Sequence, residues 1–290
     1  MYVIRMAGGL GNQLFCYAFY LRMRSQFPLE NVNINYDNYK YCKFHNGLRI
    51  AEVFDLSYPF AIKDQYSFCS RLRYKVRSVI ERITINMKNV PIIHEDLDEF
   101  NEFIKKPIEC STVLFNGTWG SEKYFNSVKE EVKTTYSHYK IKFSDKVRDL
   151  AKRMQTQNAV FMHVRRGDYL QTDFVDLSVT DYYQNALEFI KKKSKKINLT
   201  IYIISDDPEY CQKHFMFLKG ENIIFLHGNQ DYEDLFLMSN CKYAIIANSS
   251  FSWWGAYLSN AEIVCAPKER LKSRADRPHE VLYPKEWNVI

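Results

Sequence analysis

Two adjacent arginines, Arg165 and Arg166, stand in the segment HVRRGDY (residues 163–169), directly after a hydrophobic run. A guanidinium group stays charged in any environment and can pair with a diphosphate through two parallel hydrogen bonds. Because side chains alternate in direction along a strand, we expect only one of the two arginines to face a ligand. Gly167 suits a turn with exposed backbone, and Asp168 can fix an arginine or act as a base. The segment predicts a surface ion pair or a phosphate contact, and its place at a strand end favours the phosphate contact.

A glycine-rich segment near the start of the chain, GGLGNQLF (residues 8–15), predicts a strand-to-helix turn. Free backbone N–H groups at the start of a helix favour an anion. The segment is not the dinucleotide-binding fingerprint, because Leu14 stands at the third glycine position, and it is not a P-loop, because no Gly-Lys-Ser/Thr follows. The alternative is a tight turn whose glycines serve packing. We expect Gly11, Asn12 and Gln13 to bind the ligand, since the two amides add donors that a plain turn does not need.

The segment SDDPEY (residues 205–210) places two carboxylates ahead of a helix start, with Pro208 suited to the first turn. Asp206 or Asp207 can cap that helix by accepting backbone N–H bonds. A carboxylate can also accept from the edge of a guanine base. Metal binding, as in Asp-x-Asp glycosyltransferases, is a third reading, but the two aspartates are adjacent and no matching third ligand is evident. We favour the cap, with a base-reading role for one of the two.

The segment NSSFSWWGAYLS (residues 248–259) joins small hydroxyl groups to two tryptophans at a helix start. Hydroxyl groups at a helix N-terminus make a seat for phosphate. We expect Ser249 or Ser250 to contact phosphate. Trp253 and Trp254 are expected to pack in the core, as adjacent apolar residues on a helix usually do.

Short hydrophobic runs alternate with helical patterns in the C-terminal half, and they cover residues 158–164, 199–204, 222–226, 243–247 and 262–266. This alternation predicts a parallel α/β sheet, and the continuous hydrophobicity predicts strands covered on both faces. The N-terminal half begins in the same way, with strands expected at 2–6, 32–36 and 113–116 and helices at 12–24 and 122–139. Residues 54–103 read as mostly helical and irregular.

The alternation divides the chain into two expected domains, residues 1–150 and 151–290. Ligands of open α/β sheets bind beyond the carboxyl ends of the strands. Each of the four polar segments directly follows an expected strand. We therefore expect the four turns to meet in a cleft between the domains.

The composition suits a folded protein of two modest domains: 290 residues, 46% hydrophobic and 16% aromatic. A net charge of +6 fits a nucleic-acid binder, a protein resting on an anionic membrane or an enzyme for polyanionic substrates. Basic residues gather at 71–82 and 191–196, where a solvated helix face is the plain alternative. No element combines clustered basic and aromatic residues, so we do not expect nucleic acid as a partner.

Seven cysteines are scattered without CxxC or metal-ligand spacing, which suits a reducing compartment better than a disulfide framework. No run approaches about 18 apolar residues, and the first residues lack the apolar core of a signal peptide. We expect a cytoplasmic protein. The net positive charge is also compatible with peripheral contact to an anionic membrane.

In their order along the chain, the four segments resemble the motifs of the α-1,2-fucosyltransferases of glycosyltransferase family 11, and YPKEW at 283–287 is similar to that family's ending. The resemblance spans nearly the whole chain except about residues 54–109. It implies a GT-B-type α/β fold, with two Rossmann-like domains facing across a cleft. The C-terminal domain would bind GDP-fucose and the N-terminal domain would lie on the acceptor side. It also implies inverting, metal-independent transfer, without a cofactor, to the 2-hydroxyl of a galactose residue.

The resemblance also implies roles for single residues. It maps Arg165 to the β-phosphate, His163 to the neighbourhood of the nucleotide, and Asp206 or Asp207 to guanine. Ser249 and Ser250 correspond to the serine pair of the last motif.

An inverting transfer needs one in-line displacement, during which negative charge grows on the departing GDP. Arg165 is expected to stabilise that charge, and a contact of this kind typically contributes about 100- to 1000-fold in rate. Asp168 is the first candidate for the base that activates the acceptor hydroxyl, with Asp173 and Asp176 as alternatives. A GT-B transferase for another nucleotide sugar is the main rival function.

Overall fold

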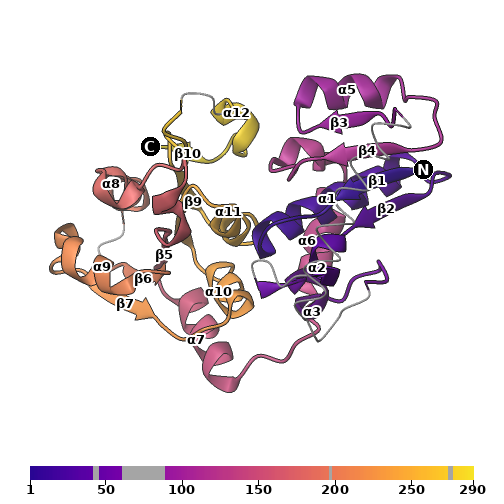
Figure 1. Cartoon of the computed structure of the whole chain (residues 1–290). Helices are drawn as coiled ribbons and strands as arrows, with labels where there is room; N and C mark the ends of the chain where they lie inside the picture. Colours follow the sequence, from indigo (N-terminus) through magenta and orange to yellow (C-terminus); the bar gives the residue numbers. More distant parts are fainter. Residues whose placement is uncertain (42–45, 61–88, 196–197, 274–276) are drawn as a thin grey trace. The chain divides into compact units, whose positions relative to one another are not determined.

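The computed structural model describes residues 1–41, 46–60, 89–195, 198–273 and 277–290 (Figure 1). It divides the chain into two units, residues 1–141 and 142–290. The sequence predicts the division after residue 150, but the structure places it earlier, after residue 141. The reason is that helix α7 (Asp145–Thr156) packs against strand β5 and helix α10 of the second unit. The basic segment at 71–82, Cys42 and Cys69 lie outside the described residues.

Unit 1 contains a four-stranded parallel sheet in the order β2-β1-β4-β3. Its strands are β1 (Tyr2–Arg5), β2 (Val32–Asn35), β3 (Ile92–His94) and β4 (Val113–Asn116). The three predicted strands of this half are confirmed. Strand β3 and helix α5 (Leu97–Lys105) occupy a segment that the sequence reads as mostly helical, so the reading was wrong for β3.

Helix α1 (Leu10–Gln26) connects β1 to β2 and is buried on most sides, which explains why its hydrophobic residues form no single stripe. The ring of Phe19 on this helix stacks on Trp119, with ring centroids 3.9 Å apart. Both side chains are fully buried. The other described helices of unit 1 are α2 (Asp37–Tyr41), α3 (Arg49–Val53), α6 (Lys129–Ser137) and the short η2 (Glu122–Tyr124) and η3 (Asn126–Val128).

Unit 2 contains a six-stranded parallel sheet in the order β10-β9-β8-β5-β6-β7. Its strands are β5 (Ala159–Val164), β6 (Thr200–Ser205), β7 (Asn222–Leu226), β8 (Tyr243–Ile245), β9 (Ile263–Ala266) and β10 (Asn288–Val289). All five predicted strands are present, and only the two-residue β10 was missed. The chain runs from β5 outward to β7, then returns to the other side of β5 with β8. The strand order therefore reverses between β5 and β8, where ligands of open α/β sheets bind.

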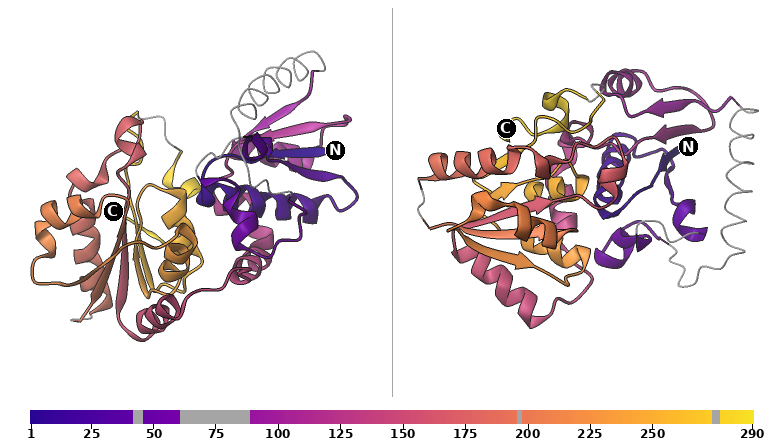
Figure 2. Two further views of the ribbon diagram at one scale, coloured as in Figure 1. Left: turned by 60° about the horizontal axis from the view of Figure 1, so that its bottom comes forward. Right: turned by 60° about the vertical axis from the view of Figure 1, so that its left-hand side comes forward.

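Helices cover both faces of the unit 2 sheet (Figure 2). Helix α8 (Tyr182–Ser194) packs on β8 and β9, whereas α10 (Asp231–Met238) packs against α7 and α11 (Ser250–Tyr257). Every residue of β5 is buried, as predicted for a strand covered on both faces. The remaining helices are α9 (Pro208–His214), α12 (His279–Leu282), η4 (Asp168–Gln171), η5 (Leu177–Val179) and η6 (Met216–Leu218).

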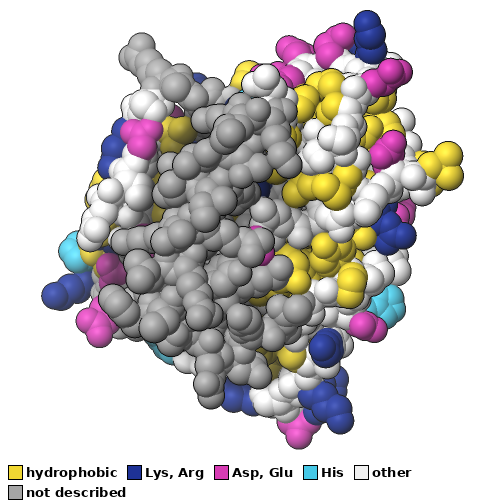
Figure 3. Space-filling view, turned by 45° about the vertical axis from the view of Figure 1, so that its right-hand side comes forward, with side chains coloured by type: hydrophobic (Ala, Val, Ile, Leu, Met, Phe, Trp, Pro, Cys, Tyr) yellow, Lys and Arg dark blue, Asp and Glu magenta, His cyan; other side chains and the backbone are white. Residues whose placement is uncertain are grey.

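On the face shown in Figure 3, acidic and basic side chains lie among one another rather than in one basic field. The five cysteines within the described ranges are free thiols. None of the described helices is long and apolar enough to span a membrane.

Candidate functional site

Three of the four polar segments meet at the carboxyl edge of the unit 2 sheet. The loops after β5, β6 and β8 leave neighbouring parallel strands, so their first residues lie side by side. Arg165 in the first loop pairs with Asp206 in the second, and Tyr169 in the first loop forms a side-chain hydrogen bond with Ser249 in the third. The fourth segment, the glycine-rich turn, belongs to unit 1.

Arg166 points into the protein, and its guanidinium is enclosed by partners. Nε donates to Oδ2 of Asp207 at 3.1 Å, and Nη1 donates to Oδ2 of Asp176 at 2.7 Å and to Oγ of Ser178. The guanidinium also lies 3.3 Å from the centre of the Tyr210 ring. Burial lowers the pKa of Arg166, but the hydrogen bond to Asp207 and the charge of Asp176 outweigh it and raise the pKa. Arg166 therefore fixes the loops to one another.

Arg165 is the arginine that reaches solvent, with a side chain 33% exposed. Its Nη2 lies 2.6 Å from Oδ1 of Asp168, and its Nη1 lies 3.1 Å from Oδ2 of Asp206. The guanidinium lies over the Tyr169 ring, 5.4 Å from its centre. A charged group held by two carboxylates and an aromatic ring is well oriented to contact an anion.

The two adjacent aspartates of the second loop have different partners. Oδ1 of Asp207 accepts from the backbone N–H of Tyr210 at 3.2 Å, so Asp207 is the predicted cap of α9, and Pro208 begins that helix as predicted. Oδ1 of Asp206 instead accepts from the backbone N–H of Arg166 at 2.9 Å. Both carboxylates thus bind Arg166, Asp206 through the backbone N–H and Asp207 through the guanidinium. A guanine-reading role for either stays a prediction.

His163 lies at the end of β5 and is buried, only 4% exposed. Burial, reinforced by the charge of Arg165, lowers the pKa of its imidazole to about 3. The ring is therefore neutral at physiological pH. Nδ1 forms no hydrogen bond with the described part of the protein, and the ring lies against Phe251 with centroids 5.7 Å apart. This side chain lies beneath the loop that carries Arg165.

The loop after β8 begins α11. Oγ of Ser249 caps the helix by accepting from the backbone N–H of Phe251 at 3.3 Å, and Ser250 is its first residue. Trp253 and Trp254 are buried, which confirms that they pack in the core. The sequence reading missed Asn248, whose Nδ2 donates to the carbonyls of residues 175 and 270 at 2.9 and 3.1 Å. The sequence feature that could have identified Asn248 is an amide side chain directly after an expected strand.

Asp173 and Asp176, the alternative candidates for the base, each form hydrogen bonds within or between loops. Oδ2 of Asp176 binds Arg166, and its Oδ1 accepts from the backbone N–H and the hydroxyl of Ser178. Asp173 accepts from the backbone N–H and hydroxyl of Ser273. By contrast, Asp168 has a half-exposed side chain bound to Arg165. Asp168 and Asp173 are both exposed, but Asp173 is bound to Ser273, so Asp168 is the one of the three carboxylates that pairs with the accessible arginine.

The glycine-rich turn of unit 1 differs from its expected role at Gln13. This side chain is fully buried, and Nε2 donates to the carbonyls of Gly8 and Gly47 at 3.0 and 2.9 Å. Its Oε1 accepts from the backbone N–H of Ile50 at 3.0 Å. The prediction that Gln13 offers a donor to a ligand was wrong, because both donors bind carbonyl groups of unit 1.

The start of α1 remains suited to an anion. Gly9 precedes the helix and provides no side-chain cap, so the first N–H groups have no side-chain acceptor from the cap position. Gly8 adopts φ +85°, and an added β-carbon would lie 2.4 Å from Nδ2 of Asn12. Gly11 is buried in the first turn, and Asn12 is partly exposed.

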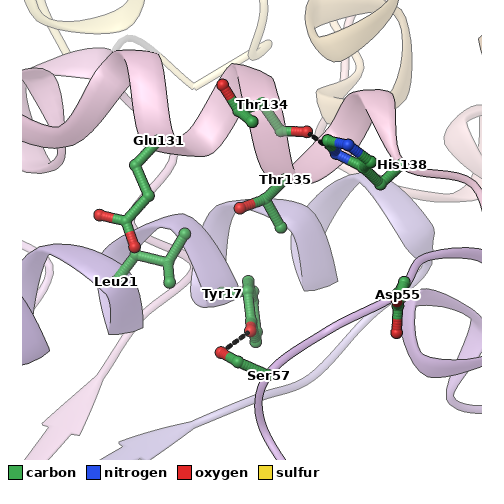
Figure 4. A pocket seen from close by; sticks show the side chains of 8 residues that line it. All are labelled: Tyr17, Leu21, Asp55, Ser57, Glu131, Thr134, Thr135 and His138. Atoms are coloured by element: carbon green, nitrogen blue, oxygen red, sulfur yellow. Dashed lines mark hydrogen bonds between the residues drawn. The ribbon is translucent and has the colours of Figure 1, made fainter.

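A cavity of about 380 Å³ lies in unit 1 between α1, α6 and residues 55–57 (Figure 4). Its lining residues are Tyr17, Leu21, Asp55, Ser57, Glu131, Thr134, Thr135 and His138. None of the predicted site residues lines it. This cavity is therefore distinct from the predicted anion-binding residues. Among the described residues, no group of three or more His, Cys, Asp or Glu side chains is arranged to bind a metal ion.

Comparison with solved structures places the fold among glycosyltransferases. Fucosyltransferase NodZ from Bradyrhizobium matches with a TM-score of 0.52 at 14% identity, over 89% of this chain and 92% of that chain. A crystal of NodZ α-1,6-fucosyltransferase soaked with GDP-fucose gives the same TM-score at 13% identity. Together with the two parallel sheets, this similarity confirms the predicted GT-B-type α/β fold class.

The family follows from the sequence match. The model of glycosyl transferase family 11 matches residues 1–290, so the chain belongs to glycosyltransferase family 11. An alpha-1,2-colitosyltransferase of Escherichia coli is 31% identical over 90% of this chain and 88% of its own length. Galactoside 2-alpha-L-fucosyltransferase Sec1 of Mus musculus is 24% identical over 91% of this chain and 66% of its own length. The chain is therefore a glycosyltransferase of this family.

Proposed function

We propose that the protein transfers L-fucose from GDP-fucose, with inversion, to the 2-hydroxyl of a galactose residue in a glycan. The accessible guanidinium of Arg165, at the point where the strand order of unit 2 reverses, carries this proposal. The N-terminus of α11 lies beside it, because Tyr169 contacts both Arg165 and Ser249. A guanidinium and a helix N-terminus together suit a diphosphate.

The chemistry that these residues would supply is electrostatic. Negative charge grows on the diphosphate as the bond to the sugar breaks, and GDP leaves as a stable anion that needs no strong acid. Arg165 would stabilise this charge, with Ser249 and Ser250 donating from the start of α11. His163 is neutral, because its pKa is about 3, and so cannot supply a proton near neutral pH.

The acceptor hydroxyl would lose its proton to a carboxylate. Asp168 is our candidate for this base, since its side chain is half-exposed and lies in the same loop as Arg165. We also propose that no metal takes part. Transfer should then continue in excess EDTA, and a loss of activity that Mg²⁺ or Mn²⁺ restores would contradict this.

A second sugar is a specific alternative. The Escherichia coli relative is a colitosyltransferase, and colitose lacks the 3-hydroxyl of fucose. A site built to hydrogen-bond that hydroxyl rejects the sugar without it strongly, whereas a site without such a bond accepts both. Fucose is our first choice because the mouse relative and the NodZ structures are fucosyltransferases.

The deciding experiment incubates the protein with GDP-fucose or GDP-colitose and a panel of galactose-terminated acceptors, followed by linkage analysis of the product. We expect an α-1,2-linked fucosyl product. Transfer of colitose alone would correct the donor, and transfer only from a UDP-sugar would refute the proposal. Thermal stabilisation by GDP but not UDP is an independent check, because a ligand that binds the folded state raises the melting temperature.

A further inference from the structure

Arg165 is shared between two carboxylates. One terminal nitrogen, Nη2, lies 2.6 Å from Asp168, and the other, Nη1, lies 3.1 Å from Asp206. Two carboxylates around one guanidinium leave an excess of negative charge at this point. Like charges repel, so this arrangement opposes a diphosphate as long as both carboxylates stay in place. Burial raises the pKa of Tyr169, and the charge of Arg270 opposes this rise, so Arg270 is a further cation at this edge.

Asp206 is the anchored carboxylate of the two. Its Oδ1 accepts from the backbone N–H of Arg166 at 2.9 Å, and its Oδ2 packs so closely on Gly167 that an added β-carbon would lie 2.5 Å away. Its side chain is 25% exposed. Moving Asp206 would break a backbone hydrogen bond and open the packing of the two loops.

The Asp168 carboxylate can move away from Arg165 at little cost. Its side chain is 50% exposed, and within the described residues its carboxylate is bound to Arg165 alone. It begins the short helix η4, where its side chain caps nothing. An exposed ion pair of this kind contributes little to stability, so breaking it is inexpensive.

Resting on the proposed function, which brings a nucleotide diphosphate to Arg165, we infer that Asp168 and a donor phosphate compete for Nη2 of Arg165. Donor binding then exchanges one anion for another on the same guanidinium. Asp168 keeps Arg165 oriented over Tyr169 and releases it to a phosphate. The same exchange frees the Asp168 carboxylate when the donor is bound.

Titration calorimetry of the full chain with GDP, and separately with inorganic pyrophosphate, tests the exchange. Asp168→Asn keeps the size of the side chain and removes its charge, so it should bind both anions about 2- to 5-fold more tightly than wild type. Asp168→Ser should behave in the same way. Asp168→Glu, which restores the carboxylate, should return the affinity toward wild type.

The matched control is Asp149→Asn, which removes one exposed carboxylate of unit 2 from a lysine pair on α7 and should leave both affinities unchanged. Equal or weaker binding by Asp168→Asn and Asp168→Ser would overturn the exchange and leave the proposed function standing. If wild type bound pyrophosphate but not GDP, the proposed function would fail. Tighter pyrophosphate binding by Asp168→Asn would still establish the exchange.

Discussion

A β-carbon added to Gly167 would lie 2.5 Å from Oδ2 of Asp206, a separation that side chains do not adopt. The same oxygen lies 3.1 Å from Nη1 of Arg165. Gly167 therefore gives Asp206 the room in which it orients the accessible arginine.

Gly167→Ala should displace the Asp206 carboxylate and with it Arg165. Misplacement of a catalytic group by about 1 Å can cost on the order of 100-fold, so we expect kcat/KM for fucosyl transfer to fall about 10- to 100-fold. Gly220→Ala is the control, because its added β-carbon meets nothing within 4 Å although its φ of +89° adds backbone strain. It should lower stability and leave transfer intact. Equal activity losses in the two variants would show that the Gly167–Asp206 contact has no special role.

Arg165→Ala should lower the rate of transfer by about 100- to 1000-fold, because it removes the charge proposed to stabilise departing GDP. The fold should survive, since the side chain is one-third exposed. Activity is compared with thermal unfolding and with stabilisation by GDP. Near wild-type transfer would remove Arg165 from the mechanism.

Arg166→Ala should have its first effect on folding. It leaves Asp176 and Asp207 without their guanidinium partner and exposes one face of Tyr210. We expect a loss of about 2–3 kcal/mol in the free energy of unfolding, measured in urea. A variant as stable as Arg165→Ala would contradict the distinction between the two arginines.

His163 should make the protein sensitive to acid. Its pKa is lowered from 6.5 to about 3 by burial and by Arg165. Between these values the unfolded chain binds a proton that the folded protein refuses, so stability falls as pH decreases through this window, by at most about 1.4 kcal/mol per pH unit. His163→Asn should flatten urea-unfolding stability between pH 6.5 and 4. His138→Asn, which changes an exposed histidine, should keep the wild-type slope.

Asp234 should act in the opposite direction. Burial, with Glu233 and Asp231 nearby, raises the pKa of Asp234 to about 6 despite the hydrogen bond from Asn229. The folded protein thus binds a proton that the unfolded chain releases between about pH 4 and 6, and this contribution is lost as pH rises. Asp234→Asn should stabilise the protein above pH 6, by about 1 kcal/mol, with the gain vanishing near pH 4. A gain that is independent of pH would exclude this cause.

The parallel sheet of unit 2 was predictable because each main strand is an uninterrupted hydrophobic run between polar turns. Strand β10 has two residues and β3 has three, too few to produce a periodic pattern. Short strands form because a neighbouring strand offers hydrogen bonds, which the local sequence does not reveal. β3 pairs with β4 in this way, and β10 with β9.

The site was predictable in its residue types more than in their partners. Strand alternation predicted that one arginine of the pair faces a ligand. Which of the two arginines faces solvent depends on Asp176 and Ser178, which bind Arg166 from a loop that begins only after η4. Gln13 was misread for the same reason, since Gly47 and Ile50 lie more than a helix away in sequence. Asp207 became the cap because it, and not Asp206, directly precedes Pro208 at the start of α9.

The amide of Asn248 has a practical consequence for producing the protein. Asn248-Ser249-Ser250 is an acceptor sequence for N-linked glycosylation, but Nδ2 of Asn248 is buried and donates to two backbone carbonyls. A glycan attached there during synthesis would replace one of the two amide hydrogens, so one of these bonds would be lost, and the glycan would not fit the closed loops. Expression through the secretory pathway of a eukaryotic host should therefore yield misfolded chains, whereas a host lacking that modification should not impose this defect.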